Sequence, residues 1–241
     1  MNFKDKRAVI TGGANGIGRY IAETFLRECA AVTVIDIDKK SHEGIKYFCG
    51  DIADKSVLES FVGSLKQPID YLINNACIGR RGLLSYCSYD DFEYVQRVGV
   101  TAPYYLTSLI LKNKLFAPNA AIVNIASTRA FQSQPDTEAY SAVKGGIAAL
   151  THSMAVSLAG RVRVNCISPG WIDTSATPGY SAQDKQQHPS GRVGTPEDIA
   201  EMVLYLCSDK AGFINGENIM IDGGMSKLMI YHGDCGWNLN K

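Results

Sequence analysis

Tyr140 and Lys144 lie four residues apart in the stretch EAYSAVKGG, a spacing that would place both side chains on one face of a helix. A tyrosine hydroxyl can give or take a proton, and a neighbouring ammonium stabilises its deprotonated form. Such a pair can move a proton to or from the oxygen of an alcohol or a carbonyl compound. The chain has 12 tyrosines and 14 lysines, so a pair at this spacing is also expected by chance, and its surroundings must decide.

Ser127 strengthens this interpretation, because it ends the apolar run AIVNIAS thirteen residues before Tyr140. In a parallel α/β sheet, ligands bind at the carboxyl ends of the strands. A serine, a tyrosine and a lysine could therefore converge on one bound molecule, provided that the run is a strand and EAYSAVKGG is a helix.

The elements that would position these side chains alternate along the whole chain. Short β-branched runs predict strands at 7–11, 31–35, 47–49, 71–73, 120–126, 162–167 and 218–221, and helical periodicity predicts helices near 16–29, 54–66, 90–116, 138–159 and 196–208. Strands that are apolar throughout indicate an α/β fold, a doubly wound parallel sheet covered by helices on both faces. No linker or repeat interrupts the pattern, which predicts a single domain over 1–241. The segment 174–195, rich in Ser, Thr, Pro, Gly and Gln, is a candidate substrate lid.

A glycine-rich stretch, TGGANGIG at 11–18, follows the first expected strand and opens the first expected helix. Glycines at such a turn let the backbone approach a pyrophosphate, and the helix N-terminus supplies N–H donors. Arg19 and Tyr20 stand where an ATPase-type phosphate loop needs Lys and Ser or Thr, so that motif is excluded.

Acidic residues after the next two strands extend this site. Asp36 lies eighteen residues after Gly18, where an acidic side chain would bind the ribose of an adenosine. Asp51 follows the third strand and could contact the adenine, or could simply begin the next helix.

Composition excludes several classes of protein. Lys and Arg together number 24, as do Asp and Glu, and no basic block stands out, which argues against nucleic acid or an anionic membrane as partner. No apolar run reaches the ~18 residues of a membrane span, and the N-terminus has no leader pattern. Seven scattered cysteines form neither CxxC nor a zinc-spaced cluster, which predicts reduced thiols, no metal site and a cytoplasmic location.

The motifs together resemble the short-chain dehydrogenase/reductase family, classical type, over nearly the whole chain. They are TGGANGIG, Asp36, NNAC at 74–77, Ser127, Tyr140-x-x-x-Lys144 and SPGWIDT at 168–174, and GRVGTPEDIA and FINGENIMIDGG are similar to the family's C-terminal third. The resemblance implies a Rossmann fold of about seven strands, a nicotinamide cofactor, an alcohol or ketone substrate, and a homodimer or homotetramer.

The resemblance also implies roles for single residues. Tyr140 would be the acid/base, Ser127 the donor to the carbonyl oxygen, and Lys144 the residue that holds the nicotinamide ribose. The expected cofactor-binding residues are Thr11, Gly12, Asn15, Gly16, Ile17, Gly18, Asp36, Asp51, Ile52, Asn75, Ala76, Tyr140, Lys144, Pro169, Gly170, Ile172 and Thr174. Asp36 predicts NAD rather than NADP, because its carboxylate would repel a 2′-phosphate.

Two positions depart from the family pattern. Cys77 replaces the last glycine of NNAG, and its thiol could be reactive or could only pack. Gly99 replaces the asparagine that is the fourth member of the family's catalytic set, inside the apolar face of the helix expected at 90–116. Pro103, four residues later, has no N–H for the Gly99 carbonyl. We expect that this carbonyl bonds a water held by Lys144; the alternative is a helix break that only shapes a subunit contact.

Two other functions are compatible with the sequence. An NADP-dependent ketoreductase of the 3-oxoacyl type would need Lys39 or Lys40 to hold the 2′-phosphate. A catalytically weakened NAD-binding regulatory protein would explain Gly99 and Cys77, although Ser127, Tyr140 and Lys144 are intact. Side chains in pocket-lining segments could favour a polar or anionic substrate or could be solvated surface groups: Arg80, Arg81, Arg129, Gln132, Trp171 and Tyr180.

Overall fold

The computed structural model describes residues 1, 3–175, 179–229, 231 and 233. Within them, one parallel sheet has the strand order β3-β2-β1-β4-β5-β6-β7. The strands are β1 Arg7–Thr11, β2 Ala31–Asp36, β3 Ile45–Cys49, β4 Ile69–Asn74, β5 Phe116–Ile125, β6 Val162–Pro169 and β7 Asn218–Ile221. The doubly wound α/β fold and its seven strands are confirmed.

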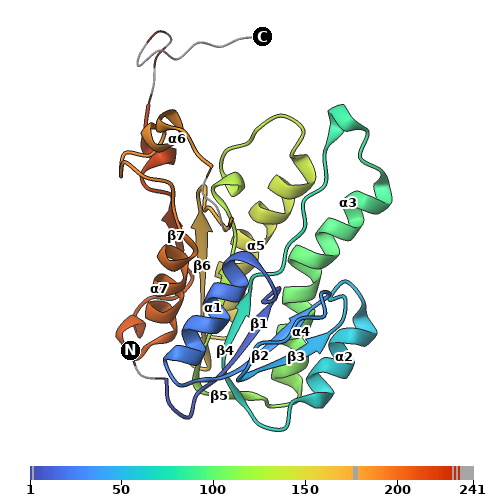
Figure 1. The fold of residues 1–241 in the computed structure, drawn as a ribbon. Coiled ribbons are helices and arrows are strands. Elements are labelled where there is room, and N and C mark those ends of the chain that lie inside the picture. Colours follow the sequence, from blue (N-terminus) through green and yellow to red (C-terminus); the bar gives the residue numbers. More distant parts are fainter. Residues whose placement is uncertain (2, 176–178, 230, 232, 234–241) are drawn as a thin grey trace.

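Helices cover both faces of the sheet (Figure 1). On one face α1 (Gly16–Arg27) packs beside α7 (Pro196–Cys207), and on the other lie α2 (Lys55–Ser64), α4 (Ala102–Lys112) and α5 (Glu138–Ser157). Every residue of the central strand β4 is buried, because both of its faces are covered. None of these helices, nor any other in the described part of the chain, is long and apolar enough to cross a membrane.

The helical stretch expected near 90–116 is present from Tyr89 to Lys112, and its regularity breaks at the two helix breakers, Gly99 and Pro103. The structure has α3 (Tyr89–Gln96), a π-helical turn at Arg97–Thr101, and then α4. The Ala102 N–H bonds the Arg97 carbonyl, five residues back, and so the register changes just before Pro103. Proline cannot donate the N–H that a continuous α-helix needs at that position. The two helix breakers therefore mark a real change of register.

The C-terminal end of α4 also differs from the expectation. Lys114 takes the left-handed conformation, with φ of 56°, and Leu115 N–H bonds the Ile110 carbonyl at 2.9 Å. This pattern ends helices, usually with glycine, and lysine gives no such signal in the sequence. β5 then begins at Phe116, four residues before the expected start, and its pairing with β4 is irregular near Asn119.

The segment 174–195 contains a short helix, α6 (Ala182–Gln186), that periodicity did not predict. Ser181 and Asp184 form a capping box at its N-terminus. An isolated bridge between Ile172 and Gly194 ties the two ends of the segment together, and residues 176–178 lie outside the described residues.

Candidate active site

A cleft of about 510 Å³ opens at the carboxyl ends of β1, β2 and β4. The strand order reverses between β1 and β4, which is where doubly wound sheets bind nucleotides. Eleven of the expected cofactor-binding residues line this cleft, namely Gly12, Asn15, Gly16, Ile17, Gly18, Asp36, Asp51, Ile52, Asn75, Ala76 and Thr174. The structure thus brings together residues from five separate segments of the chain.

Two glycines of the β1–α1 turn pack so closely against neighbouring backbone that neither position has room for a side chain. A Cβ at Gly12, where φ is +67°, would lie 2.7 Å from the Cα of Ala76. A Cβ at Gly18 would overlap the Gly12 carbonyl oxygen and the Asn75 amide. Glycine is required at both positions by close backbone approach, as in a turn that holds a pyrophosphate.

Thr11 and Asn75 hold this turn against the loop after β4. The Thr11 hydroxyl accepts hydrogen bonds from the N–H groups of Asn75 and Ala76, at 3.1 and 3.0 Å. The Asn75 amide donates to the carbonyls of Thr11 and Gly12, at 3.1 and 2.9 Å. Thr11 is buried and so positions the cleft wall instead of lining it.

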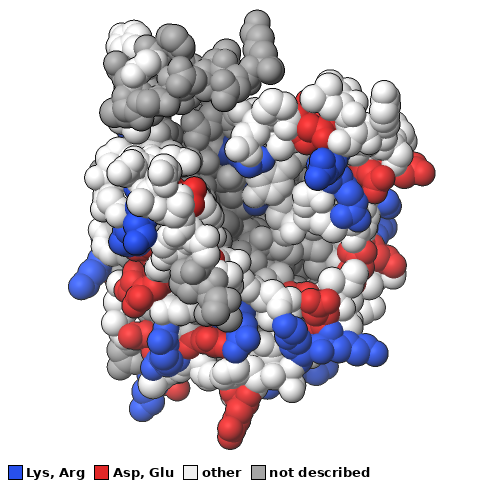
Figure 2. All heavy atoms as spheres, turned by 45° about the horizontal axis from the view of Figure 1, so that its top comes forward, with Lys and Arg blue, Asp and Glu red and all other residues white. Residues whose placement is uncertain are grey.

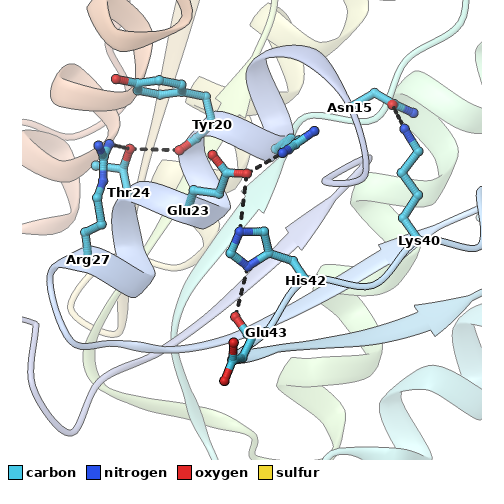
Figure 3. Close-up of polar contacts among 9 residues, drawn as sticks. Asn15, Tyr20, Glu23, Thr24, Arg27, Lys40, His42 and Glu43 are labelled. Atoms are coloured by element: carbon cyan, nitrogen blue, oxygen red, sulfur yellow. Dashed lines mark hydrogen bonds and ion pairs between the residues drawn. The ribbon is translucent and has the colours of Figure 1, made fainter.

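The Asp36 carboxylate is held in place by the phosphate turn. Its two oxygens accept from the Ala14 and Asp38 N–H groups, both at 2.9 Å. Figure 3 shows Lys40 reaching from the loop after β2 to the side chain of Asn15, whose amide also donates to Asp38 at 2.7 Å. Asp38 and Lys40 therefore both bond the side chain of Asn15, which lines the cleft together with Asp36.

Tyr94 is a member of this site that sequence reasoning missed. Its hydroxyl donates to Asp51 at 2.9 Å, and its ring lines the same cleft. Burial, together with this hydrogen bond, raises the pKa of Tyr94. No local motif predicts the contact, because α3 follows Asp51 by some forty residues and only the fold brings them together.

The reactive side chains lie at the carboxyl end of β5. Lys144 is buried and donates to the Ile125 carbonyl at 2.8 Å, and its Nζ is 5.4 Å from the centroid of the Tyr140 ring. Ser127 caps a 3₁₀ turn at Thr128–Ala130 and lines a second cavity of about 840 Å³ together with Tyr140. The expected convergence of Ser127, Tyr140 and Lys144 is therefore present in the geometry.

Residues that follow the end of β6 line both cavities. Gly170 and Ile172 line the larger cavity, whereas Thr174 lines the cofactor cleft opposite Gly16. A Cβ at Gly170 would lie 2.6 Å from the Cβ of Asp222, so the close approach there excludes a side chain. Pro169 is buried at the strand end and lines neither of the two cavities.

The two departures from the family pattern have different surroundings. Cys77 lines the cofactor cleft and also packs against the small cluster of Val95, Ala139 and Val143. Gly99 is buried in the π-helical turn, and a Cβ there would overlap the Cγ1 of Val143. Val143 thus fills the space that a side chain at position 99 would need.

Similarity to known proteins covers this site and the whole domain. The family model described as enoyl-(acyl carrier protein) reductase matches residues 12–226. An uncharacterized oxidoreductase of Thermotoga maritima is 40% identical, covering 95% of this chain and 99% of its own. The chain belongs to the short-chain dehydrogenase/reductase family.

Two further proteins are similar to this chain over nearly its whole length. A 3-oxoacyl-[acyl-carrier-protein] reductase FabG of Chlamydia pneumoniae is 32% identical, covering 92% of this chain and 97% of its own. The structure of an apo SCOR enzyme from Clostridium thermocellum superposes with a TM-score of 0.89 at 46% identity, covering 98% and 99% of the two chains. This short-chain dehydrogenase/reductase is accordingly an oxidoreductase that acts on CH–OH and carbonyl groups.

Proposed function

We propose that this oxidoreductase uses NAD and that Tyr140 is its acid/base. The observation that carries the proposal is that two neighbouring cavities lie at the carboxyl ends of the strands: the glycine-rich turn lines one, and Ser127 and Tyr140 line the other. The turn fits a dinucleotide, because Gly12 and Gly18 pack closely against Ala76 and against the Gly12 carbonyl, and the N-terminus of α1 at Gly16–Gly18 lines the cleft, where its N–H groups can bind a pyrophosphate. When bound, the nicotinamide supplies or accepts a hydride at the substrate carbon.

The chain's own residues then move one proton. In the direction of reduction, the Tyr140 hydroxyl donates its proton to the substrate oxygen, while the Ser127 hydroxyl donates a hydrogen bond to the same oxygen. The buried Lys144 ammonium stabilises the resulting phenolate. An ammonium has three N–H donors, and Ile125 takes one of them, so two remain for the ribose and for a water.

Gly99 belongs to the proposed proton relay through its main chain. Gly99 packs against Val143, the residue directly before Lys144, and the π-helical turn interrupts the α-helical pattern of carbonyl bonding there. A carbonyl acceptor needs no asparagine side chain. A water between the Gly99 carbonyl and the Lys144 ammonium would then complete the relay.

The general test is turnover. The protein is incubated with a broad panel of alcohols in the presence of NAD or NADP, and of ketones in the presence of NADH or NADPH, and the nicotinamide absorbance is followed. Oxidation of an alcohol with NAD or reduction of a ketone with NADH supports the proposal, whereas binding of NADH without turnover of any compound would favour the regulatory protein instead.

We expect that replacing Asp36 with alanine narrows the preference for NADH over NADPH by about tenfold or more, a change of about 1.4 kcal/mol in relative binding. The carboxylate can accept both ribose hydroxyls but repels a 2′-phosphate. Lys40→Ala should widen the preference, because it removes the nearest ammonium. Fluorescence titration of the two reduced cofactors measures both effects. The control is Asp209→Ala, at the exposed far end of the sheet, which should leave the preference unchanged. Tighter binding of NADPH than of NADH by the unaltered protein would contradict the assignment of NAD as the cofactor.

A 3-oxoacyl-type reductase using NADP is the second candidate, supported by the similarity to the Chlamydia pneumoniae relative and by the position of Lys40 beside the cleft. A neutral 3-oxoacyl thioester tested with both cofactors separates the two candidates.

The remaining proposals concern the assembly and the lid. We expect the protein to be cytoplasmic and to form a homodimer or homotetramer, and analytical ultracentrifugation would measure the number of subunits.

The segment 174–195 is proposed to cover the substrate. Thr174 lines one cavity, Gln187 lines the other, and Trp171 packs edge-on against Tyr180.

A further inference from the structure

The larger cavity, beside Tyr140, carries an excess of positive charge. Three arginines line it, Arg80, Arg81 and Arg129, against one carboxylate, Asp136. Figure 2, with the top of Figure 1 brought forward, shows the hollow in this face and basic atoms beside it. A cavity lined in this way attracts anions and repels cations.

Arg129 is the arginine closest to the chemistry. Its main-chain N–H donates to the Ser127 hydroxyl at 3.2 Å, and its Cζ lies 5.9 Å from the centroid of the Tyr140 ring. Its side chain is half-buried and donates to the neutral amide oxygen of Gln134. In the described part of the chain, neither Arg129 nor Arg81 forms an ion pair.

The one carboxylate that lines the cavity, that of Asp136, already accepts hydrogen bonds from other groups. Asp136 accepts hydrogen bonds from the Gly82 and Ser85 N–H groups, at 2.9 and 3.1 Å, and from the Ser85 hydroxyl. The hydroxyl hydrogen bond, aided by those N–H groups, lowers the pKa of Asp136. Asp136 thus holds the loop at 82–85 against the start of α5 and leaves the Arg129 guanidinium without a carboxylate. Arg80 differs from the other two arginines, because it pairs with Asp91 at 3.1 Å.

We propose that the substrate is a small oxo or hydroxy carboxylic acid, and that the Arg129 guanidinium binds its carboxylate while the reacting oxygen meets Ser127 and Tyr140. The proposal rests on the hydride transfer proposed above and adds the class of substrate. A carboxylate would replace the neutral Gln134 acceptor by a charge-assisted, bidentate pair, which is the stronger interaction. Arg81, on the exposed rim, adds to the attraction.

The reaction balances with the carboxylate unchanged. In reduction, hydride from NADH adds to the carbonyl carbon, the carbonyl π bond breaks toward oxygen, and the Tyr140 proton completes the hydroxyl. The oxo acid is reduced to the hydroxy acid and NADH is oxidised to NAD. Arg129 only binds and orients the acid, so it determines specificity and takes no part in the proton transfer.

The direct test is binding of an unreactive anion to the protein saturated with NADH. Oxamate and oxamide differ only in a carboxylate against an amide, and calorimetric titration measures their affinities. Oxamate is expected to bind at least tenfold more tightly than oxamide. Arg129→Gln should weaken oxamate binding by about 10- to 100-fold, the range for a hydrogen-bonded charge. Arg129→Lys should restore only part of it, and the matched control Arg161→Gln, on the exposed opposite end of the sheet, should leave it unchanged.

Turnover separates this inference from the function on which it rests. Short 2-oxo and 3-oxo acids are compared with their methyl esters. The ratio of kcat/KM for the acid to kcat/KM for the ester is measured in Arg129→Gln and in Arg161→Gln. The ratio should fall by about 10- to 100-fold in Arg129→Gln and stay constant in Arg161→Gln. Esters reduced as well as acids, or equal binding of oxamate and oxamide, overturn the proposed substrate class while the oxidoreductase stands. Selective binding of oxamate without turnover of any compound leaves the anion site established and refutes the proposed reaction.

Discussion

Replacing Tyr140 with phenylalanine is expected to lower kcat by about 100- to 10,000-fold, the usual contribution of a positioned proton donor. NADH binding should change by less than about threefold, because the variant loses only the hydroxyl and keeps the ring, whose centroid lies 5.9 Å from the Arg129 Cζ and 5.4 Å from the Lys144 Nζ. Steady-state rates with any substrate found in the panel, together with fluorescence titration of NADH, measure the two effects separately.

A second variant, Lys144→Met, tests the role of the buried ammonium. The ammonium is buried and donates to the Ile125 carbonyl, so methionine leaves a buried acceptor unpaired and should lower both stability and cofactor binding. Tyr140→Phe, by contrast, should have the same melting temperature as the unaltered protein. If the phenylalanine variant keeps more than about a tenth of the rate, a loss of less than ~1.4 kcal/mol in transition-state stabilisation, Tyr140 is not the acid/base.

The gathering of these residues in one cleft was predictable from the sequence, because they follow strand ends directly. Gly12, Gly18 and Asp36 stand at positions where chain geometry leaves little freedom: a tight turn, a close backbone contact and the end of the neighbouring strand. Parallel pairing of β1 with β2 then brings the turn and Asp36 together without further information.

Features that depend on contacts between distant segments were not predictable. The bond from Tyr94 to Asp51 requires the packing of α3 beside the end of β3, and the orientation of Arg129 toward Tyr140 requires the turn at 128–130. The helix end at Lys114 was missed for a local reason, because a lysine with positive φ carries no sequence signal.

Gly99 shows how a sequence pattern can point to the correct position for an incomplete reason. The pair of helix breakers predicted an irregular backbone, and the π-helical turn agrees with it. The sequence did not reveal that Gly99 also lies against Val143, a fully buried residue of α5, so that glycine is needed for packing as well. No motif predicts this contact, in which Val143 occupies the space that a Cβ at position 99 would need.

Gly99→Ala is expected to lower the free energy of unfolding by about 1–3 kcal/mol, the usual cost of overpacking. The added Cβ would overlap the Cγ1 of Val143, and a β-branched side chain on a helix has little rotamer freedom to move away. The matched control is Gly63→Ala in α2, where a Cβ meets nothing within 4 Å and alanine should stabilise the helix by roughly 0.5–1 kcal/mol. Urea unfolding of both variants measures the difference.

A double-mutant cycle tests whether Val143 is the cause. Val143→Ala alone should destabilise the protein, because it leaves a cavity in the core, but Gly99→Ala with Val143→Ala should be more stable than the sum of the single changes by about 0.5–3 kcal/mol. Gly99→Asn should then be tolerated only together with Val143→Ala, and this pair would restore the family's asparagine in a folded protein. If the two changes are additive, or if Gly99→Ala is as harmless as Gly63→Ala, then contact with Val143 does not explain the glycine, and its role lies in the backbone of the π-helical turn alone.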